Sequence, residues 1–206
     1  MRLQIILLFI ITLLGGVLRF YQLGQTPQSL TWDEVAIGYN AYSILRTGRD
    51  EYGNFLPTSF RSFEDYKSPL YIYGTTLSLA IFGKSEFAIR FLSALTGTLT
   101  IPLLALWVVK IIGKNNFSLA LLTSLLCATS PWHLHFSRVA YESNLALFFC
   151  ATILNFASAL VSTIRQSSVA APPQYYLRRS RYVFVRQHSP FPTTYHHCNR
   201  NDLLAY

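Results

Sequence analysis

Four long apolar runs limit what this chain can fold into more than any other feature of its sequence. They occupy residues 3–23, 87–112, 117–131 and 144–164, and the first run contains a single charged side chain, Arg19. About 20 apolar residues in a helix span the roughly 30 Å hydrocarbon core of a bilayer. A soluble domain rarely combines such runs with only 13% charged residues. The sequence therefore predicts an all-α, polytopic membrane protein embedded in a lipid bilayer.

The composition divides the chain into four parts. Residues 1–23 are expected to form a first transmembrane helix that is retained as a signal anchor, because no small-residue cleavage pattern follows it; a cleaved signal peptide is the alternative. Residues 24–68 form a polar loop with most of the acidic side chains, and residues 69–164 form a transmembrane helical region. Residues 165–206 form a basic tail without helical periodicity, which we expect to be disordered or aberrant.

Basic residues indicate which connections lie in the cytoplasm. Lys110 and Lys114 flank one short connection, and several arginines follow residue 164. The positive-inside rule places both groups in the cytoplasm. The apolar run at residues 69–82 is short for a complete span. If it does not cross the cell membrane, the loop 24–68 and the connection 132–143 both lie on the outer face; if it crosses, one of these assignments fails.

Two adjacent carboxylates, Asp33 and Glu34, open a helical pattern in the stretch SLTWDEVAIGYNAYSILRTG, residues 29–48. Thr31 and Glu34 have the spacing of a capping box, and Gly48 stands where a left-handed residue ends a helix. Adjacent helical residues point about 100° apart, so the two carboxylates cannot act on one atom. We predict that Glu34 mainly starts the helix while Asp33 faces a cleft; the alternative is that both only begin the helix.

Three cations are candidates for binding an anionic group. Lys67 precedes the apolar run 69–82, and it either pairs with a phosphate or extends along apolar surface to reach water. Arg90 lies within an apolar helix, where an unpaired charge is costly, so a partner or water must be near it. Arg138 is the third cation, and with Glu142 four residues further on it also fits a local ion pair.

The order of these motifs resembles a known family. After a first span come TWDEVAIGYNAYSILRTGRDEYGNFLPTSF, YKSPLYIY, FGKSEFAIRFLSALTGTLTIPLL and SPWHLHFSRVAYESNLALFF. Together, over residues 3–162, they resemble the N-terminal part of the bacterial dolichyl-phosphate-mannose-protein mannosyltransferase-like glycosyltransferases of the membrane GT-C superfamily. The resemblance implies a GT-C-like transmembrane helix bundle with an outer loop that carries interfacial helices.

The resemblance also implies an activity and a site. A family member moves a sugar from a polyprenyl-phosphate carrier to a hydroxyl acceptor, protein or glycan, on the outer face of the membrane with inversion. Asp33 matches the acidic residue of the family's first outer loop, followed by Glu34 as in its Asp-Glu form. Lys67 matches the basic residue before a proline-leucine pair, and Arg90 matches the arginine of an R-x-x-S-A motif. We expect Asp33 and Glu34 to be catalytic, and Lys67, Arg90 and Arg138 to bind the donor phosphate.

Four aromatic residues are candidates for contact with the sugar or the acceptor: Trp32, Tyr39, Tyr42 and Tyr66. They either stack on a sugar face or form the aromatic belt typical of a membrane boundary. No cofactor is required by these residues; a divalent metal held by Asp33 and Glu34 is an alternative that no cluster in the sequence demands. We expect no nucleic acid among the partners.

The chain departs from the family pattern in two respects. It has Ser68-Pro69 where the family often has two prolines, and it stops after a few apolar segments, without the further helices and soluble domain of family members. An inactive, truncated or frame-shifted remnant is therefore one alternative to an enzyme. A non-catalytic transporter or assembly subunit is the other, although transporters place their charges near the bilayer midplane rather than in one boundary loop.

Overall fold

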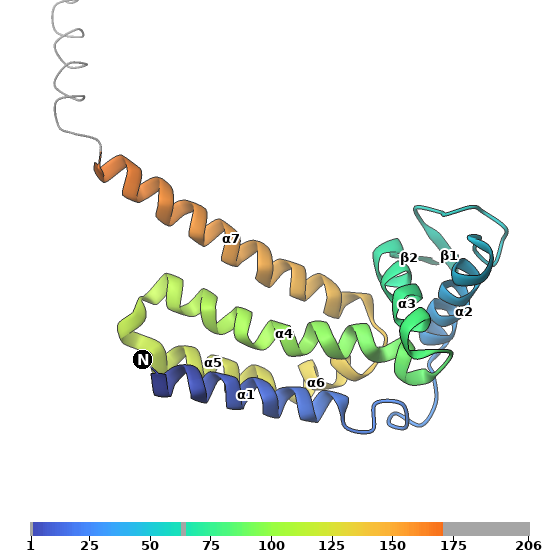
Figure 1. Ribbon diagram of the computed structural model, residues 1–206, viewed down its shortest axis with the longest axis horizontal. Helices are drawn as coiled ribbons and strands as arrows, with labels where there is room; N and C mark the ends of the chain where they lie inside the picture. Colours follow the sequence, from blue (N-terminus) through green and yellow to red (C-terminus); the bar gives the residue numbers. More distant parts are fainter. Residues whose placement is uncertain (1, 63–64, 171–206) are drawn as a thin grey trace, which may run out of the picture. The chain divides into compact units, whose positions relative to one another are not determined.

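A computed structural model describes residues 2–62 and 65–170, apart from the side chains of Lys114 and residues 165–170. These residues form helices and one short sheet (Figure 1). The helices are α1 (Arg2–Phe20), α2 (Trp32–Thr47), α3 (Pro69–Phe82), α4 (Glu86–Ile112), α5 (Phe117–Thr129), α6 (Pro131–Arg138) and α7 (Glu142–Ala170), with a 3₁₀ turn, η1 (Lys114–Asn116), before α5. The strands β1 (Phe60–Ser62) and β2 (Asp65–Lys67) pair antiparallel, with Arg61 opposite Tyr66.

The long apolar helices account for the membrane-spanning part of the chain. Among the described residues, α1, α4 and the segment Glu142–Ile164 of α7 are long and apolar enough to cross a membrane. α5 and α6 pass the same test together, although they bend by 54° at their junction. The bend has a local cause, because Pro131 begins α6 and cannot continue the hydrogen-bond ladder of α5. The structure confirms the predicted all-α, multi-pass membrane fold.

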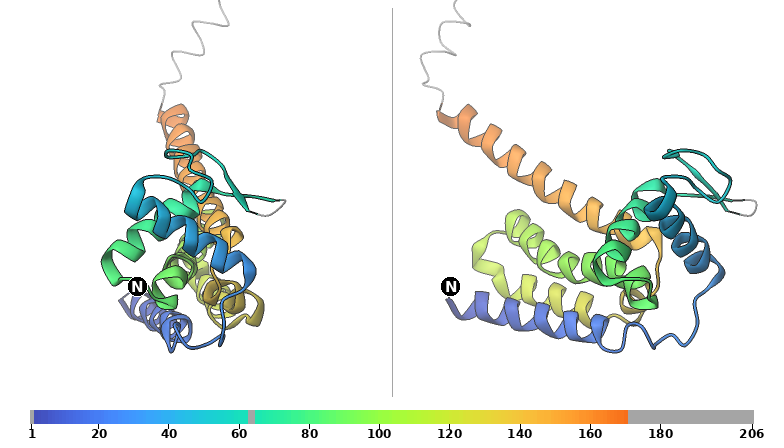
Figure 2. Two further views of the ribbon diagram at one scale, coloured as in Figure 1. Left: turned by 90° about the vertical axis from the view of Figure 1, so that its right-hand side faces the viewer. Right: turned by 45° about the vertical axis from the view of Figure 1, so that its right-hand side comes forward.

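α1, α4 and α5 pack against one another in the apolar part of the fold (Figures 1 and 2). Gly15 of α1 permits close approach, because a side chain there would overlap Ile101 of α4. Gly97 of α4 likewise leaves room for Ser137 of α6. Small residues at such positions let helix backbones approach in a bilayer, where helices associate through packing rather than through the hydrophobic effect.

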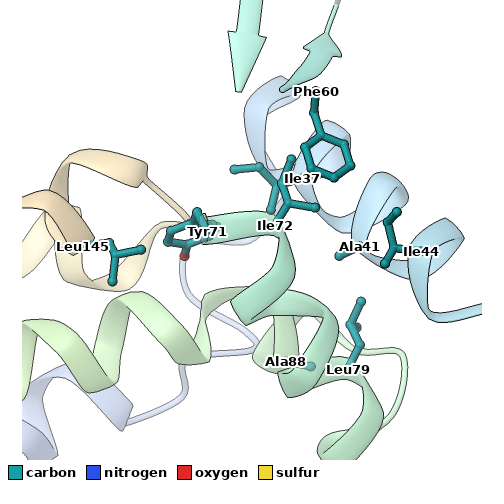
Figure 3. Close-up of a cluster of buried hydrophobic side chains, with 10 residues drawn as sticks. Ile37, Ala41, Ile44, Phe60, Tyr71, Ile72, Leu79, Ala88 and Leu145 are labelled. Carbon is teal, nitrogen blue, oxygen red and sulfur yellow. The ribbon is translucent and has the colours of Figure 1, made fainter. Parts of the chain in front are cut away.

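α2, α3 and the β1–β2 hairpin form a layer at one end of the bundle (Figure 2). α3, only 14 residues long, packs against both α2 and α4. Figure 3 shows the buried side chains that join these elements: Ile37, Ala41 and Ile44 of α2, Tyr71, Ile72 and Leu79 of α3, Phe60 of β1, Ala88 of α4, and Leu145 of α7, with Ala140 completing the cluster. The short apolar run at residues 69–82 is therefore a core helix of this layer.

Several connections meet at this end of the bundle. The C-terminal end of α1 and the N-terminal ends of α4 and α7 lie beside the α2–α3 layer (Figure 1). Hydrogen bonds link them directly: Arg90 of α4 donates to the carbonyl of Leu23 at 3.2 Å, and the Ser68 N–H donates to Glu142 of α7 at 2.6 Å. This arrangement is the one expected if α3 does not cross the membrane.

From the sequence, we expect residues 165–206 to form a disordered or aberrant tail. α7 continues to Ala170, and residues 171–206 lie outside the described residues. The described residues divide into two units between Val161 and Ser162. The four-part division drawn from composition stays a prediction.

Candidate active site

The first turn of α2 places its two carboxylates in different surroundings. The Glu34 N–H donates to the Thr31 hydroxyl at 3.3 Å, and the Thr31 N–H donates to Glu34 Oε2 at 2.9 Å, so the predicted capping box is present. Gly48, at φ 69°, ends the helix in the left-handed conformation, as predicted. Asp33, one residue before Glu34, points about 100° away around the helix. Its side chain is 45% exposed, whereas that of Glu34 is 0% exposed.

Glu34 is bound on several sides by donors from distant segments. Arg90 of α4 places Nε 2.8 Å from Oε1 and Nη2 3.2 Å from Oε2. The Ala140 N–H, from the connection between α6 and α7, donates to Oε1 at 2.9 Å. Burial alone would raise the pKa of Glu34, but the hydrogen bonds from Arg90, Ala140 and Thr31 outweigh burial and lower it. Glu34 is therefore an anion that joins α2, α4 and the start of α7.

Arg90 uses all of its N–H groups on protein acceptors. Besides Glu34, it donates to the carbonyls of Leu23 at 3.2 Å, Pro27 at 2.9 Å and Ser29 at 2.9 Å. A guanidinium has five N–H donors, and these contacts occupy every one of them. The predicted contact of Arg90 with a phosphate stays a prediction. In this conformation the side chain is fully buried and holds the segment between α1 and α2.

Lys67 of β2 lies beside Asp33. Its Nζ is 2.7 Å from Asp33 Oδ1 and 3.1 Å from Asp65 Oδ2. Burial alone would lower the pKa of Lys67, but the contacts with Asp33 and Asp65 raise it above its ordinary value. The lysine is only 13% exposed, so the hairpin holds a cation against a carboxylate that itself remains open to solvent.

Arg138 binds the end of α1. It donates at 2.7 Å to the carbonyl of Leu18, a group that the helix end leaves unpaired. It also donates at 3.0 Å to the carbonyl of Thr26, in the segment after α1. Glu142, the local partner considered from sequence, instead accepts the Ser68 N–H. Of the three predicted phosphate-binding cations, all of which the structure describes, it brings Lys67 alone within ion-pair distance of Asp33.

Two of the four predicted aromatic contacts line one hollow. The hollow has a volume of about 500 Å³ and is lined by Leu30, Trp32, Val35, Ala36, Tyr39, Glu51, Tyr52 and Ser62. Tyr42 does not line it; the charged groups of Arg46 and Lys84 lie 5.6 Å and 5.0 Å from the centre of the Tyr42 ring. Tyr66 is exposed on β2 and also lies outside the lining.

Three residues with defined contacts were missed by the sequence reasoning, two at the hollow and one at the end of α1. Glu51 and Tyr52 follow the end of α2 and line the hollow, because the chain turns back after Gly48. The acidic-aromatic pair in RDEYGN was the available signal, but nothing in its spacing places it beside α2. Arg19 is fully buried, and it donates to the carbonyls of Cys127 and Ala128 at the end of α5 and contacts His133 at 2.7 Å. Its isolation within an apolar run was the signal that it needed such acceptors.

The carboxylates do not form a metal-binding group. In the described ranges, no three His, Cys, Asp or Glu side chains come together in a way that would hold a metal ion. Asp33 faces Lys67 and Glu34 faces Arg90, so the two carboxylates do not converge on a shared ligand position. In this arrangement Asp33 and Glu34 do not hold one metal ion between them.

The pairs Asp33–Lys67 and Glu34–Arg90 both lie within a stretch that matches a described family. The match, to dolichyl-phosphate-mannose-protein mannosyltransferase, covers residues 9–171. No curated protein and no solved structure matches the chain.

Proposed function

The chain belongs to the dolichyl-phosphate-mannose-protein mannosyltransferase family, and from this premise we propose that it transfers a sugar from a polyprenyl-phosphate donor to a hydroxyl group. The acceptor is a protein, or a glycan as the alternative. Transfer takes place on the outer face of the cell membrane and inverts the anomeric carbon. The observation that carries this proposal is the 2.7 Å contact between Asp33 and Lys67. It places a potential base beside a cation in the layer formed by α2, α3 and the β1–β2 hairpin.

Asp33 is the proposed general base. The acceptor oxygen attacks the anomeric carbon from the face opposite the phosphate, and its proton passes to the Asp33 carboxylate. A carboxylate within hydrogen-bond reach of the acceptor can take this proton as the new bond forms. The exposed fraction of Asp33, 45%, supports this role because the acceptor must reach its oxygen.

Lys67 is the proposed phosphate contact. As the bond between the anomeric carbon and the phosphate oxygen breaks, the leaving polyprenyl phosphate gains negative charge, which a fixed cation stabilises. The contacts of Lys67 with Asp33 and Asp65 keep the lysine charged before the donor binds. We infer that the phosphate replaces Asp33 at Lys67, which releases the carboxylate to act as the base.

Glu34, Arg90 and Arg138 have proposed positioning roles. Glu34 is fully buried against Arg90, so it acts by fixing the first turn of α2 and with it the direction of Asp33. Arg138 holds the C-terminal end of α1 and the carbonyl of Thr26, close to the start of α2 in the sequence. Trp32 and Tyr39 are the proposed aromatic contacts with the substrate, since they line the hollow beside this turn.

The test is a transfer assay with the full chain in lipid nanodiscs. The donor is polyprenyl-phosphate mannose with a radioactive sugar, and the acceptor is a short peptide with one threonine. We expect labelled peptide whose anomeric configuration, read by NMR, is opposite to that of the donor. Correctly inserted protein that labels neither the peptide nor a glycan acceptor would identify the chain as a remnant or a non-catalytic subunit. Retained configuration would exclude the single displacement.

A further inference from the structure

The hollow beside α2 combines aromatic rings with one carboxylate. Trp32, Tyr39 and Tyr52 supply the rings, and Glu51 supplies the carboxylate. Its volume of about 500 Å³ falls within the range of pockets that bind small ligands. Aromatic faces attract cations, and they do so more strongly where a carboxylate contributes its own charge.

The hollow is lined by neighbours of the proposed reacting pair, although neither Asp33 nor Lys67 lines it. Trp32 directly precedes Asp33, so their α-carbons are about 3.8 Å apart. Ser62, which also lines the hollow, pairs across the hairpin with Asp65, the second carboxylate bound to Lys67. The hollow is therefore one residue from Asp33 along the chain and one cross-strand pair from Asp65, the neighbour of Lys67.

A buried amide holds Glu51 in place. Asn40 of α2, which is 1% exposed, donates from Nδ2 to Glu51 Oε1 at 3.1 Å. The Glu51 N–H donates back to Asn40 Oδ1, also at 3.1 Å. Both bonds join the same two residues, so the backbone and the carboxylate of Glu51 are fixed together. The side chain is thus prearranged rather than free to turn into solvent.

Among the described residues Glu51 forms no ion pair, although Arg61 lies beside the hollow, with its guanidinium carbon 5.7 Å from the centre of the Tyr52 ring. Within residues 2–62 and 65–170, the cationic side chains that form ion pairs do so with Asp33, Glu34, Asp65 and Glu86, and none pairs with Glu51. A donor phosphate in the hollow would meet this carboxylate and be repelled, whereas Lys67 is available to it nearby. The charge thus favours a cationic occupant and disfavours the phosphate end of the donor.

We propose that the hollow binds the acceptor polypeptide through a lysine or arginine side chain close to the hydroxyl residue, with Glu51 as the residue that selects it. This inference rests on the proposed transfer to a protein hydroxyl. The cationic group lies against Glu51 among the aromatic rings, and the neighbouring hydroxyl is directed toward Asp33. Acceptors with an acidic side chain at that position are rejected by the same carboxylate.

The test compares three peptides that differ in one side chain, in two sets, one for each position that flanks the threonine. Each has one threonine among alanines, with lysine, glutamine or glutamate placed at each flanking position in turn. Binding is measured without donor, by photo-crosslinking of the peptide to the full chain in nanodiscs, and transfer is then measured with polyprenyl-phosphate mannose. At one flanking position, the lysine peptide should bind about threefold to fivefold more tightly than the glutamine peptide, as expected for a partly exposed ion pair.

Two variants of Glu51 distinguish the effect of its charge on peptide binding from its effect on the structure. Glu51→Gln keeps an oxygen that accepts from Asn40 but loses the charge, so the preference for lysine should disappear while the glutamine peptide binds as before. Glu51→Lys should reverse the preference and favour the glutamate peptide. Equal binding of all three peptides to the wild-type chain would overturn the proposal, and so would a Glu51→Gln variant that changes only the KM for the donor. Because crosslinking needs no transfer, these outcomes are distinct from a failure of the proposed enzymatic activity.

Discussion

The Nε atom of Arg90 lies 2.8 Å from Oε1 of Glu34, and neither side chain is exposed. The two residues are 56 positions apart in the chain, on α4 and α2. The pair therefore fixes the layer that carries Asp33 and Lys67 to a membrane-spanning helix. Because Glu34 also caps α2, any movement of this pair changes the direction of the neighbouring Asp33.

Removal of Arg90 should destabilise the protein strongly. Arg90→Met leaves the Glu34 carboxylate buried without its countercharge, and breaking a buried pair in this way costs about 3–5 kcal/mol. Thermal unfolding of the purified chain in detergent measures the loss. Glu34→Gln combined with Arg90→Met removes both charges, and we expect this double variant to be more stable than Arg90→Met alone. An Arg90→Met protein as stable as wild type would show that the pair does not hold α2 to α4.

Asp33→Asn should fold normally and lose transfer. The amide oxygen of asparagine still accepts a hydrogen bond from Lys67, but it does not take the proton of the acceptor. We expect kcat to fall by about 10²–10⁴, the usual contribution of a general base, with only a small decrease in unfolding temperature from the weakened contact with Lys67. Asp65→Asn is the matched control, because Asp65 is the other partner of Lys67 and is 75% exposed; its loss of activity should be much smaller. Equal activity of Asp33→Asn and wild type would exclude Asp33 as the base.

Glu142 should affect donor binding through the backbone next to Lys67. It accepts the Ser68 N–H at 2.6 Å, at the junction of β2 and α3. Glu142→Ala leaves this N–H without its acceptor and should cost about 1.5–3 kcal/mol of stability, the range for hydrogen bonds to charged groups. Since Ser68 follows Lys67 directly, we also expect a higher KM for the donor. Glu142→Gln keeps an acceptor oxygen and should restore most of both properties; if it behaves like Glu142→Ala, the charge rather than the hydrogen bond is what matters.

Acid should weaken the link between α2 and α4. The pKa of Glu34 is lowered in the folded protein, so its contribution to stability is present above its ordinary value of 4.5 and is lost as the pH falls through the lowered value. The unfolding temperature should decline over this acidic range. In Glu34→Gln the decline should be smaller, because that side chain does not titrate. Identical pH profiles for the two proteins would contradict this assignment.

Alkali should weaken the contact between Asp33 and Lys67. The pKa of Lys67 is raised, so its contribution is present below the ordinary lysine value of 10.5 and is lost as the pH rises through the raised value. Lys67→Met should remove this alkaline loss and leave the acidic loss due to Glu34 in place. Unfolding temperatures measured across both pH ranges separate the two contributions, and an alkaline loss that persists in Lys67→Met would assign it to another group.

The sequence by itself determined the features that depend on neighbouring residues. The apolar runs predicted the spanning helices, because burial in a bilayer needs only a long enough apolar segment. Thr31, Glu34 and Gly48 predicted the start and end of α2, because the atoms that cap a helix lie within a few positions of its ends. The order of the motifs also indicated the family, which the match over residues 9–171 confirms.

Only the tertiary structure decided which charged groups meet. Arg90 was expected to need a partner, but its choice of Glu34 depends on how α2 docks against α4. Arg138 likewise binds the end of α1 rather than Glu142, four positions away. Glu51 reaches the hollow because Asn40, eleven positions earlier, is buried where it can bind it. The sequence indicates which charged side chains need a partner, whereas the packing of distant helices determines which partner comes within reach.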